Sequence, residues 1–381
     1  MTTSGSVGLD VGGTYLKAAW LGDSPPRVIR RVIPEFAETT GSSREIDPAA
    51  LMKSVTELLA EVIGRGSCKR IFITGQMAGL AFVDSQGRPL APLISWQDTR
   101  FDAVESVRSQ LSPADLSSLG DGLRVGLPLV TLSELDFPRH AFVTSLIGFV
   151  AGALIGSRAT WIHSTDAASL GLLDVVKCHW SSGALDVAKL PKGSLPSPVA
   201  DVLPLGTDRV FGAEVMTPVG DQQASLLGSG LTIDEISMNI GTGCQVSVLS
   251  LTPASPAQLR PYFTGKFLQT VTHLPAGRIL TTAVKDQFGD SQSKEAWEQA
   301  ARSADDLSSP VGHAVNAITG ACIDAAHILG TGSSIAFTGG VSRKFEAIRQ
   351  RIADKLGLPF RLYSGDDAAL AGLQVLASEC E

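Results

Sequence analysis

A short glycine-containing turn near the N-terminus carries residue types that could bind a phosphate group. An apolar run ends at Asp10, and the turn continues through Gly12, Gly13 and Thr14 to Lys17. Glycines in a tight turn let backbone N–H groups approach a phosphate closely, and the threonine hydroxyl and the lysine add a donor and a positive charge. Asp10 is placed where a carboxylate could hold the water shell of a magnesium ion. An ordinary β-hairpin with an Asx turn has the same pattern, so this turn alone leaves both interpretations open.

A second turn, Gly241-Thr242-Gly243, repeats this chemistry in the other half of the sequence. The stretch LDVGGTYLKAAWL has a counterpart in MNIGTGCQVSVLS, and in both an apolar strand, a glycine turn and another apolar strand follow one another. This faint internal repeat predicts two similar domains. A nucleotide held between two domains needs a phosphate contact on each side, so two turns favour phosphate binding more strongly than one.

A third glycine motif comprises Gly339 and Gly340, with Ser342 two residues further on. It follows a buried apolar run and opens a helix, and glycines at such a place let a flat group such as adenine approach the backbone. The alternative is a plain strand-to-helix turn, which is common.

Asp221 stands directly before the apolar positions of a helix, in the stretch GDQQASLLG. Aspartate is a frequent helix N-cap, which is one explanation for its position. The other is a general base, because phosphoryl transfer to a hydroxyl needs a carboxylate within hydrogen-bond reach of the nucleophile. The two interpretations are compatible, and spacing alone does not choose between them.

Residues 94–100, ISWQDTR, combine Trp96 with Asp98 and Arg100. An indole face is a good platform for the C–H side of a sugar, and the Asp/Arg pair is of a kind that is often exposed. The alternative is a core tryptophan beside a surface ion pair.

The elements that must position these residues follow an α/β pattern. After the first hairpin, Asp47 and Pro48 begin a helix whose apolar face repeats at helical spacing up to Gly64, and a buried strand follows at 71–74. This order predicts an α/β domain. Prolines cluster before 218, and we place a boundary there, with one domain at 1–218 and another at 219–381.

The composition excludes several classes of protein. The chain has 381 residues, 44% of them hydrophobic, and a formal net charge of -7 without any basic run, so we expect no nucleic-acid partner. Five separated cysteines predict reduced thiols. The uncharged stretch 141–156 is shorter than the roughly 20 residues of a membrane-spanning helix, and we expect a buried helix there. The start of the sequence is not that of a secretory signal. We therefore expect a cytoplasmic protein without a membrane partner.

Taken together and in order, these motifs resemble the FGGY carbohydrate kinase family, within the superfamily of sugar kinases, Hsp70 and actin. The segments 10–17 and 241–243 resemble its two phosphate motifs, 339–343 its adenosine motif, and ISWQDTR its tryptophan-containing signature. Residues 75–79 (GQMAG) lie where the family has a sugar-contacting loop, and 166–180 and GDQQASLLG are also similar to the family. Within it, the WQD signature and the stretches 260–263 and 274–279 are most similar to sedoheptulokinase-like members.

The resemblance implies an α/β fold of two ribonuclease-H-like (actin-like ATPase) domains with a cleft between them. It also implies ATP and Mg²⁺ as cofactors and a ketose or polyol as substrate, such as sedoheptulose, xylulose or ribulose. By carry-over, Asp221 is the catalytic base and Asp10 helps to place the metal. The expected cofactor-binding residues are Gly12, Gly13, Thr14, Lys17, Gly241, Thr242, Gly243, Gly339, Gly340 and Ser342. The expected substrate-binding residues are Gln76, Met77, Trp96, Asp98 and Asp221.

Two departures from the family leave the substrate open. The chain is shorter than typical members, and Ala78 stands where many ketose-specific members carry a histidine, which removes a polar partner for a hydroxyl. A catalytically weak sugar-binding or regulatory protein on the same scaffold is the alternative to an active kinase. An Hsp70- or actin-like ATPase lacks support, because the tryptophan signature and GDQQ belong to the sugar kinases. The oligomeric state is left open, with a homodimer as one alternative.

Overall fold

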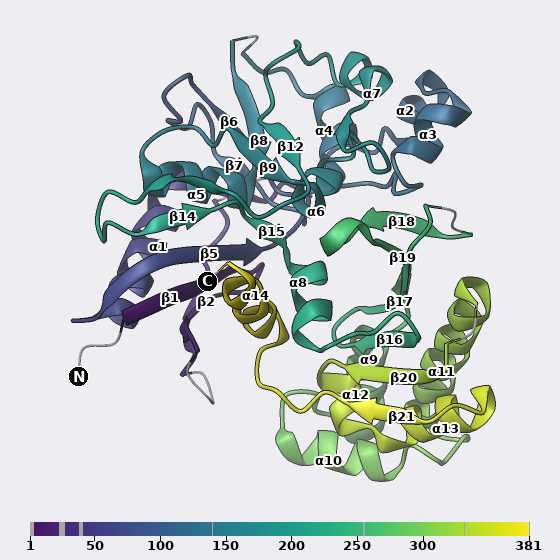
Figure 1. Cartoon of the computed structure of the whole chain (residues 1–381). Coiled ribbons are helices and arrows are strands. Elements are labelled where there is room, and N and C mark those ends of the chain that lie inside the picture. The colour runs from purple at the N-terminus through teal and green to yellow at the C-terminus, as the bar shows by residue number, and fades with distance from the viewer. Residues whose placement is uncertain are drawn as a thin grey trace. The chain divides into compact units, whose positions relative to one another are not determined.

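The computed structural model describes residues 4–22, 27–37, 41–138, 140–253, 256–330 and 332–380. The chain forms two compact units (Figure 1). Unit 1 comprises Met1–Gly228, Pro261–Gly265 and Asp367–Glu381, and unit 2 comprises Ser229–Arg260 and Lys266–Asp366.

The central sheet of unit 1 is mixed. Its strands lie in the order β13 (Pro204–Thr207), β14 (Glu214–Met216), β5 (Ser67–Gly75), β1 (Ser4–Val11), β2 (Tyr15–Leu21) and β3 (Ile29–Val32), and the short β15 (Val219–Gly220) also pairs with β5. β2 is antiparallel to both of its neighbours, β1 and β3, whereas β5 is parallel to β1, and β14 is parallel to β5. The first three strands are thus a meander, and the later strands are added on the other side of β1.

The sheet of unit 2 has the same plan. Its order is β18 (Gln258–Pro261), β19 (Phe267–Leu274), β17 (Cys244–Ser250), β16 (Glu235–Ile240), β20 (Ser334–Thr338) and β21 (Phe360–Leu362). β16 and β17 form the hairpin that corresponds to β1 and β2, and β20 and β21 are parallel additions. This order, with these directions, is that of a ribonuclease-H-like domain in each unit. The predicted α/β fold class and the predicted internal repeat are confirmed.

Helix α1 (Pro48–Ile63) shows how local sequence signals fix an element. The Asp47 side chain accepts a hydrogen bond from the Ala49 N–H, Pro48 occupies the first turn, and Gly64 ends the helix as predicted. The buried face packs on the strands of unit 1 and consists of Leu51, Val55, Leu58, Leu59, Val62 and Ile63.

The stretch 141–156, expected to be one buried helix, is a strand followed by a helix. Phe142–Ser145 forms β8, which pairs with β6 (Leu80–Val83), and only Leu146–Ile155 forms α5. The Ser145 side chain caps α5 by accepting a hydrogen bond from the Gly148 N–H. The expectation of one helix was wrong because the residues before α5 pair with β6, a strand from a distant part of the chain, and the mostly apolar composition of the run does not display that pairing.

A smaller sheet and several short elements complete unit 1. The sheet has the order β4 (Glu45–Ile46), β7 (Leu93–Ile94), β6 and β8. The short elements are α2 (Val104–Gln110), α3 (Pro113–Ser118), α4 (Pro128–Glu134), β9 (Trp161–His163), α6 (Ser164–Ala167), the 3-10 helix η1 (Ala168–Leu170), β10 (Leu173–Asp174), β11 (His179–Trp180), α7 (Ser182–Val187) and β12 (Ser197–Val199).

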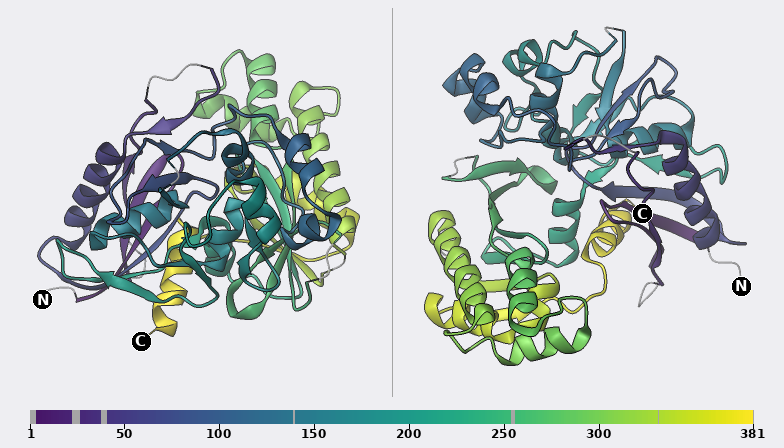
Figure 2. Two further views of the ribbon diagram at one scale, coloured as in Figure 1. Left: turned by 90° about the horizontal axis from the view of Figure 1, so that it is seen from above. Right: turned by 180° about the vertical axis from the view of Figure 1, so that it is seen from behind.

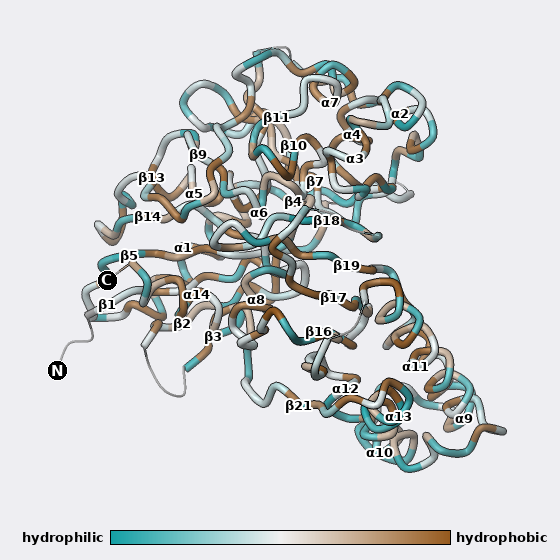
Figure 3. Tube along the Cα trace, turned by 45° about the vertical axis from the view of Figure 1, so that its right-hand side comes forward, coloured by the Kyte–Doolittle hydropathy of each residue, from teal (hydrophilic) through white to brown (hydrophobic). Residues whose placement is uncertain are grey.

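The helices of unit 2 are α9 (Gly277–Phe288), α10 (Lys294–Arg302), α11 (Pro310–Leu329), α12 (Gly340–Lys344) and α13 (Glu346–Leu356). The short 3-10 helix η2 (Phe263–Gly265) belongs to unit 1. Residues of β16, β20, α11 and α13 share one apolar core. The surface helix α10 is mostly hydrophilic (Figure 3).

The division into units differs from the predicted boundary at 218/219. Helix α8 (Asp221–Gly228) belongs to unit 1, where it packs against α14 (Ala368–Glu379), and the short segment 261–265 also belongs to unit 1. The chain therefore passes from one unit to the other after Gly228, around 261–265, and again at Asp367 (Figures 1 and 2).

Candidate functional site

The first turn holds a lysine between two carboxylates. Asp10 at the end of β1 pairs in register with Lys17 on β2. The Lys17 Nζ lies 3.0 Å from Asp10 Oδ2 and 2.9 Å from Asp367 Oδ2. Asp367 also caps α14 by accepting a hydrogen bond from the Leu370 N–H at 3.2 Å. The sequence analysis did not single out Asp367, because its partner Lys17 lies at the opposite end of the chain.

The electrostatics of this cluster follow from burial and charge. Burial raises the pKa of Asp10 to about 6, against the effect of Lys17, so the carboxyl group is still mostly ionised at neutral pH. Burial lowers the pKa of Lys17, but the charges of Asp10 and Asp367 outweigh it and raise the pKa overall. At neutral pH the first hairpin therefore carries the mostly ionised Asp10 and the charged Lys17 side by side.

The tryptophan signature lies against the first turn, as a shared site requires. A Cβ atom at Gly13 would lie 2.9 Å from the Trp96 Nε1 atom, so the indole N–H and the turn are neighbours. Trp96 is 38% exposed and keeps part of its ring accessible. The structure thus brings together Gly13 and Trp96, which are predicted to contact phosphate and sugar respectively.

Gln76 hydrogen-bonds to the backbone of the first turn. The Gln76 backbone N–H donates to the Val11 carbonyl at 2.9 Å, and its Nε2 group donates to the Gly12 carbonyl at 3.4 Å. The Ser95 hydroxyl donates to Gln76 Oε1 at 3.2 Å. Gln76 is 2% exposed, so its amide connects the turn to the tryptophan segment.

Asp98 has a similar structural role. It accepts hydrogen bonds from the Arg44 N–H at 2.7 Å and from the Arg100 guanidinium at 2.6 Å, and Arg100 also contacts Glu45 at 2.6 Å. Burial opposes ionisation, but the hydrogen bonds from Arg100 and from the Arg44 backbone lower the pKa of Asp98. The carboxylate therefore fixes the segment that carries Trp96.

Asp221 begins helix α8 directly after β15. The Gly220 N–H donates to Thr165 Oγ1 at 3.0 Å, and a Cβ atom at Gly220 would lie 3.0 Å from Met77 Sδ. Met77, from the predicted sugar-contacting loop, is thus a neighbour of the residue before Asp221. The carboxylate in the first turn of α8 is favoured by the helix dipole.

The turn of unit 2 is open. The Gly241 N–H donates to the Gly243 carbonyl, and the Gly277 N–H at the start of α9 donates to the Gly241 carbonyl, both at 2.9 Å. A Cβ atom at Gly243 would meet no atom of the described chain within 4 Å. The fold therefore does not itself require glycine at 243, and the N-terminus of α9 beside the turn is favourable for an anion. The sequence analysis did not identify Gly277, whose signal is the glycine in LPAGRIL.

The adenosine-like motif shows one glycine that the fold requires and one that it does not. Gly339 has φ 96°, and a Cβ atom there would lie 2.4 Å from the Ile240 carbonyl oxygen. At Gly340 a Cβ atom would meet nothing within 4 Å among the described residues. The buried Ser342 hydroxyl donates to the Thr338 carbonyl at 2.6 Å, so it also ties α12 to β20.

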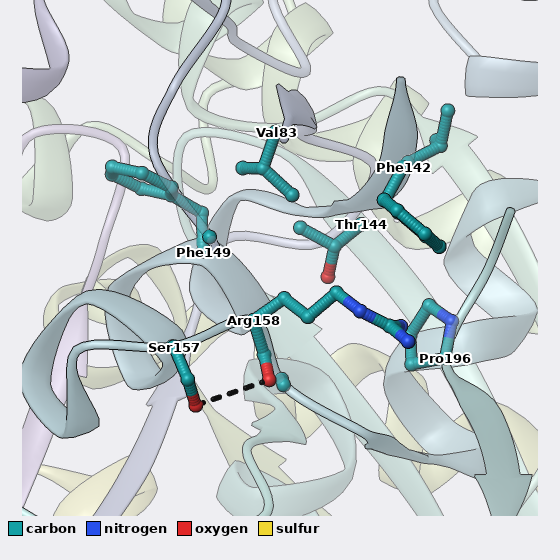
Figure 4. A pocket seen from close by; sticks show the side chains of 12 residues that line it. Val83, Phe142, Thr144, Phe149, Ser157, Arg158 and Pro196 are labelled. Atoms are coloured by element: carbon teal, nitrogen blue, oxygen red, sulfur yellow. Dashed lines mark hydrogen bonds between the residues drawn. The ribbon is translucent and has the colours of Figure 1, made fainter. Parts of the chain in front are cut away.

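A separate hollow in unit 1 contains none of the predicted site residues (Figure 4). It lies between Phe142, Thr144, Phe149 and Arg158, with the Arg158 guanidinium carbon 4.1 Å from the centre of the Phe142 ring. In the described part of the chain, no three His, Cys, Asp or Glu side chains are grouped to hold a metal ion. None of the described helices is both long and apolar enough to cross a membrane.

Residues 6–135 match the family model described as the FGGY family of carbohydrate kinases, N-terminal domain. This part of the chain is therefore similar to the FGGY carbohydrate kinases, the family that its motifs resemble. The chain is similar to the glycerol kinase of Rhizorhabdus wittichii, with 28% identity over 67% of this chain and 52% of that protein. It is also similar to the apulose kinase of Pectobacterium atrosepticum, with 26% identity over 66% of this chain and 56% of that protein. The chain spans about half the length of the curated relatives it matches.

The fold extends beyond the family match. The gluconate kinase from Lactobacillus acidophilus superposes on 99% of this chain and 89% of its own, with a TM-score of 0.85 and 17% identity. At this identity the likeness shows the fold, and it covers both units. The similarity to sedoheptulokinase-like members stays a prediction.

Proposed function

We propose that this protein is an ATP-dependent kinase that transfers the γ-phosphoryl group of ATP to a hydroxyl of a ketose or polyol. The observation that carries the proposal is the equivalent glycine turn in the two units, with Asp10 beside the first turn and Asp221 beside the Met77 loop. The family of residues 6–135 and the names of the similar proteins, glycerol kinase and apulose kinase, support the same class of reaction.

The residues of both turns fit ATP and Mg²⁺. Gly243 and Gly340 leave room that none of the described residues fills, and backbone N–H groups in glycine turns are donors for phosphate oxygens. Asp10 presents the hard carboxylate oxygen that Mg²⁺ prefers. When bound, the metal neutralises negative charge that develops on the phosphates. Thr14, Thr242, Gly241 and the ammonium group of Lys17 are the further proposed nucleotide contacts.

On the acceptor side we assign the proton transfer to Asp221. Its carboxylate takes the proton from the attacking hydroxyl while the new O–P bond forms, and ADP leaves with the electron pair of the broken bond. Trp96 contacts the acceptor through its exposed ring. Met77 offers a thioether, and the next residue, the buried Ala78, holds a backbone conformation with φ 62°. We propose Gln76 and Asp98 as residues that shape this surface, because their side-chain polar groups hydrogen-bond within the chain.

The experiment is a panel of pentuloses, heptuloses, tetritols and glycerol, with ADP release measured for the wild type and Asp221→Asn. The amide keeps the size but cannot accept the proton, so kcat with the best acceptor should fall about 100-fold or more, while ATP affinity changes little. Asp324→Asn, on an exposed site of α11, is the matched control and should behave as wild type. Near-normal turnover in Asp221→Asn contradicts the assignment of the base. Acceptor and ATP binding without turnover in the wild type would favour the sugar-binding alternative.

A further inference from the structure

A fully buried carboxyl group outside the assigned machinery lies beside the proposed base. Asp166 in α6 is 0% exposed, and the Ser145 hydroxyl donates to its Oδ2 atom at 2.5 Å. Its Oδ1 atom is buried and has no hydrogen-bond partner within the described residues. An ionised carboxylate in such a place is costly, because one oxygen loses its hydration without compensation. The protonated acid is the form that this environment accommodates.

The elements around Asp166 connect it to both parts of the acceptor site. Thr165, the residue before it, accepts the hydrogen bond from the Gly220 N–H directly before Asp221. Three residues after it, Ser169 accepts a hydrogen bond at 3.0 Å from the N–H of Ala78 in the sugar-contacting loop. α6 and η1 therefore fix the start of α8 and the strained loop residue Ala78, whose φ is positive.

We propose that Asp166 is a positioning residue that works as a neutral acid, holding α6 between Ala78 and Asp221, and that its ionisation disturbs this arrangement and lowers turnover. This inference rests on the proposed kinase function. An ionised Asp166 would place a second negative charge next to Asp221 in a site with little water, where like charges repel strongly.

The charges around Asp166 support a titration near neutral pH. Burial raises the pKa of Asp166 to about 7, the charge of Asp221 raises it further, and hydrogen bonds from Ser145 and Ser169 oppose the shift. α6 also packs against β9, β12, β15 and η1, and His163 is the titratable residue of these elements. Burial lowers the pKa of His163 to about 4, so its ring is neutral when Asp166 titrates. Among these groups, the titration of Asp166 beside Asp221 is therefore the change in charge that matters near neutral pH.

The test is the pH profile of kcat/KM for the best acceptor of the panel, between about pH 5 and pH 9. We expect the wild type to lose activity as the pH rises through about 7. The amide in Asp166→Asn cannot ionise, so kcat/KM of this variant should not decline at alkaline pH. Its pH dependence on the acid side should follow the wild type, and its activity at pH 6 should be within about threefold of wild type. Ser145→Ala removes the donor that stabilises the carboxylate, so its decline should move to higher pH. The control Asp324→Asn should follow the wild type.

Two results would overturn the inference. The first is that Asp166→Asn shows the same alkaline decline as the wild type. The second is that Asp166→Asn is less active than the wild type by the same factor at every pH, because a purely structural role would give that result. Thermal unfolding provides a readout independent of turnover. Because the pKa of Asp166 is raised from its ordinary value near 4 to about 7 in the folded protein, wild-type stability falls as the pH rises from about 4 to about 7 and then levels off, and Asp166→Asn should lose less over this interval. If no acceptor is phosphorylated, the proposed function fails, whereas equal pH dependence of unfolding in the two proteins rejects the neutral acid itself.

Discussion

At the scale of single residues, the two equivalent hairpins differ in charge. In unit 1 the paired positions before and after the turn are Asp10 and Lys17, whereas in unit 2 they are Asn239 and Gln245. The neutral pair keeps the hairpin geometry without offering a carboxylate. An ion that needs a charged oxygen ligand is therefore expected at the turn of unit 1, and the turn of unit 2 is suited to phosphate contacts through backbone N–H groups.

Asp98 gives the first prediction at this scale. Asp98→Ala leaves the Arg44 N–H and the Arg100 guanidinium without their carboxylate partner, so it should lower the free energy of unfolding by about 2–4 kcal/mol. Because the pKa of Asp98 is lowered in the folded protein, this contribution is present above the ordinary pKa of about 4 and is lost as the pH falls through the lowered value. Urea denaturation at about pH 7 and about pH 3 measures both effects. Asp102→Ala, on an exposed neighbour, is the control.

If Asp98→Ala and Asp102→Ala have equal stability at neutral pH, Asp98 does not hold the tryptophan segment as we describe. A loss that stays the same at low pH would show that packing, rather than the ionised carboxylate, accounts for it.

The sequence indicated those candidate site residues whose proposed role can be read from the residues next to them. The glycine turns and Asp221 are recognisable from their immediate neighbours. The partners that decide what Gln76 and Asp98 do, Gly12 and Arg44, come from distant parts of the chain, and a sequence pattern does not display them. For the same reason no role was predicted for Asp166, the first residue of the family-like stretch 166–180, since its burial and its hydrogen bond from Ser145 exist only after folding.

At the scale of elements, the crossing of α8 and α14 depends on two glycines. A Cβ atom at Gly228 would lie 2.0 Å from the Ala368 carbonyl oxygen, and one at Gly372 would lie 1.9 Å from the Ala224 carbonyl oxygen. The two backbones therefore pack directly on one another. α8 begins with Asp221 and α14 follows Asp367, so this crossing places both carboxylates within unit 1.

This close packing predicts the effect of Gly372→Ala. The added methyl group must push the two helix backbones apart, which should cost at least about 2 kcal/mol of unfolding free energy and lower kcat through Asp221. Gly320→Ala in α11 is the matched control, because a Cβ atom there meets nothing within 4 Å of the described chain. Alanine favours a helix, so this control should be more stable by up to about 1 kcal/mol. Denaturant titrations of both variants measure these changes in the free energy of unfolding. If Gly372→Ala is as stable as the wild type, the two helices do not cross as closely as we describe.

Helices and strands, like the site residues, could be predicted where their signals are local in the sequence. α1 could be derived in full from Asp47, Pro48 and its apolar spacing, because caps and periodicity are local signals. The division of 141–156 into β8 and α5 depended on a partner strand, β6, some 60 residues earlier. The assignment of 261–265 to unit 1 likewise depends on contacts such as the hydrogen bond from Gln223 Nε2 to the Pro261 carbonyl.

At the scale of the whole molecule, the repeated strand order places an equivalent turn in each unit. A shared fold explains why both units contain this hairpin. It does not explain why a glycine without close neighbours stands at the tip of a hairpin. Gly243 is open in this sense, and Gly13 is limited by the Trp96 indole. Because each turn is proposed to contact phosphate, a change in either turn is expected to weaken nucleotide binding.

Isothermal titration with a non-hydrolysable ATP analogue and Mg²⁺ tests this shared contact. Gly243→Ala should leave stability almost unchanged, because its Cβ atom meets no described residue, yet it should weaken nucleotide binding about tenfold, or about 1.4 kcal/mol, by blocking the approach of phosphate to the backbone. Gly13→Ala should weaken binding similarly while displacing Trp96, and the double variant should lose the sum of both free energies at an unchanged stoichiometry of one. Gly320→Ala, an equally open glycine far from both turns in sequence, should bind as wild type. Unchanged affinity in Gly243→Ala alongside a loss in Gly13→Ala would assign the nucleotide to unit 1 alone and reject the turn of unit 2 as a phosphate contact.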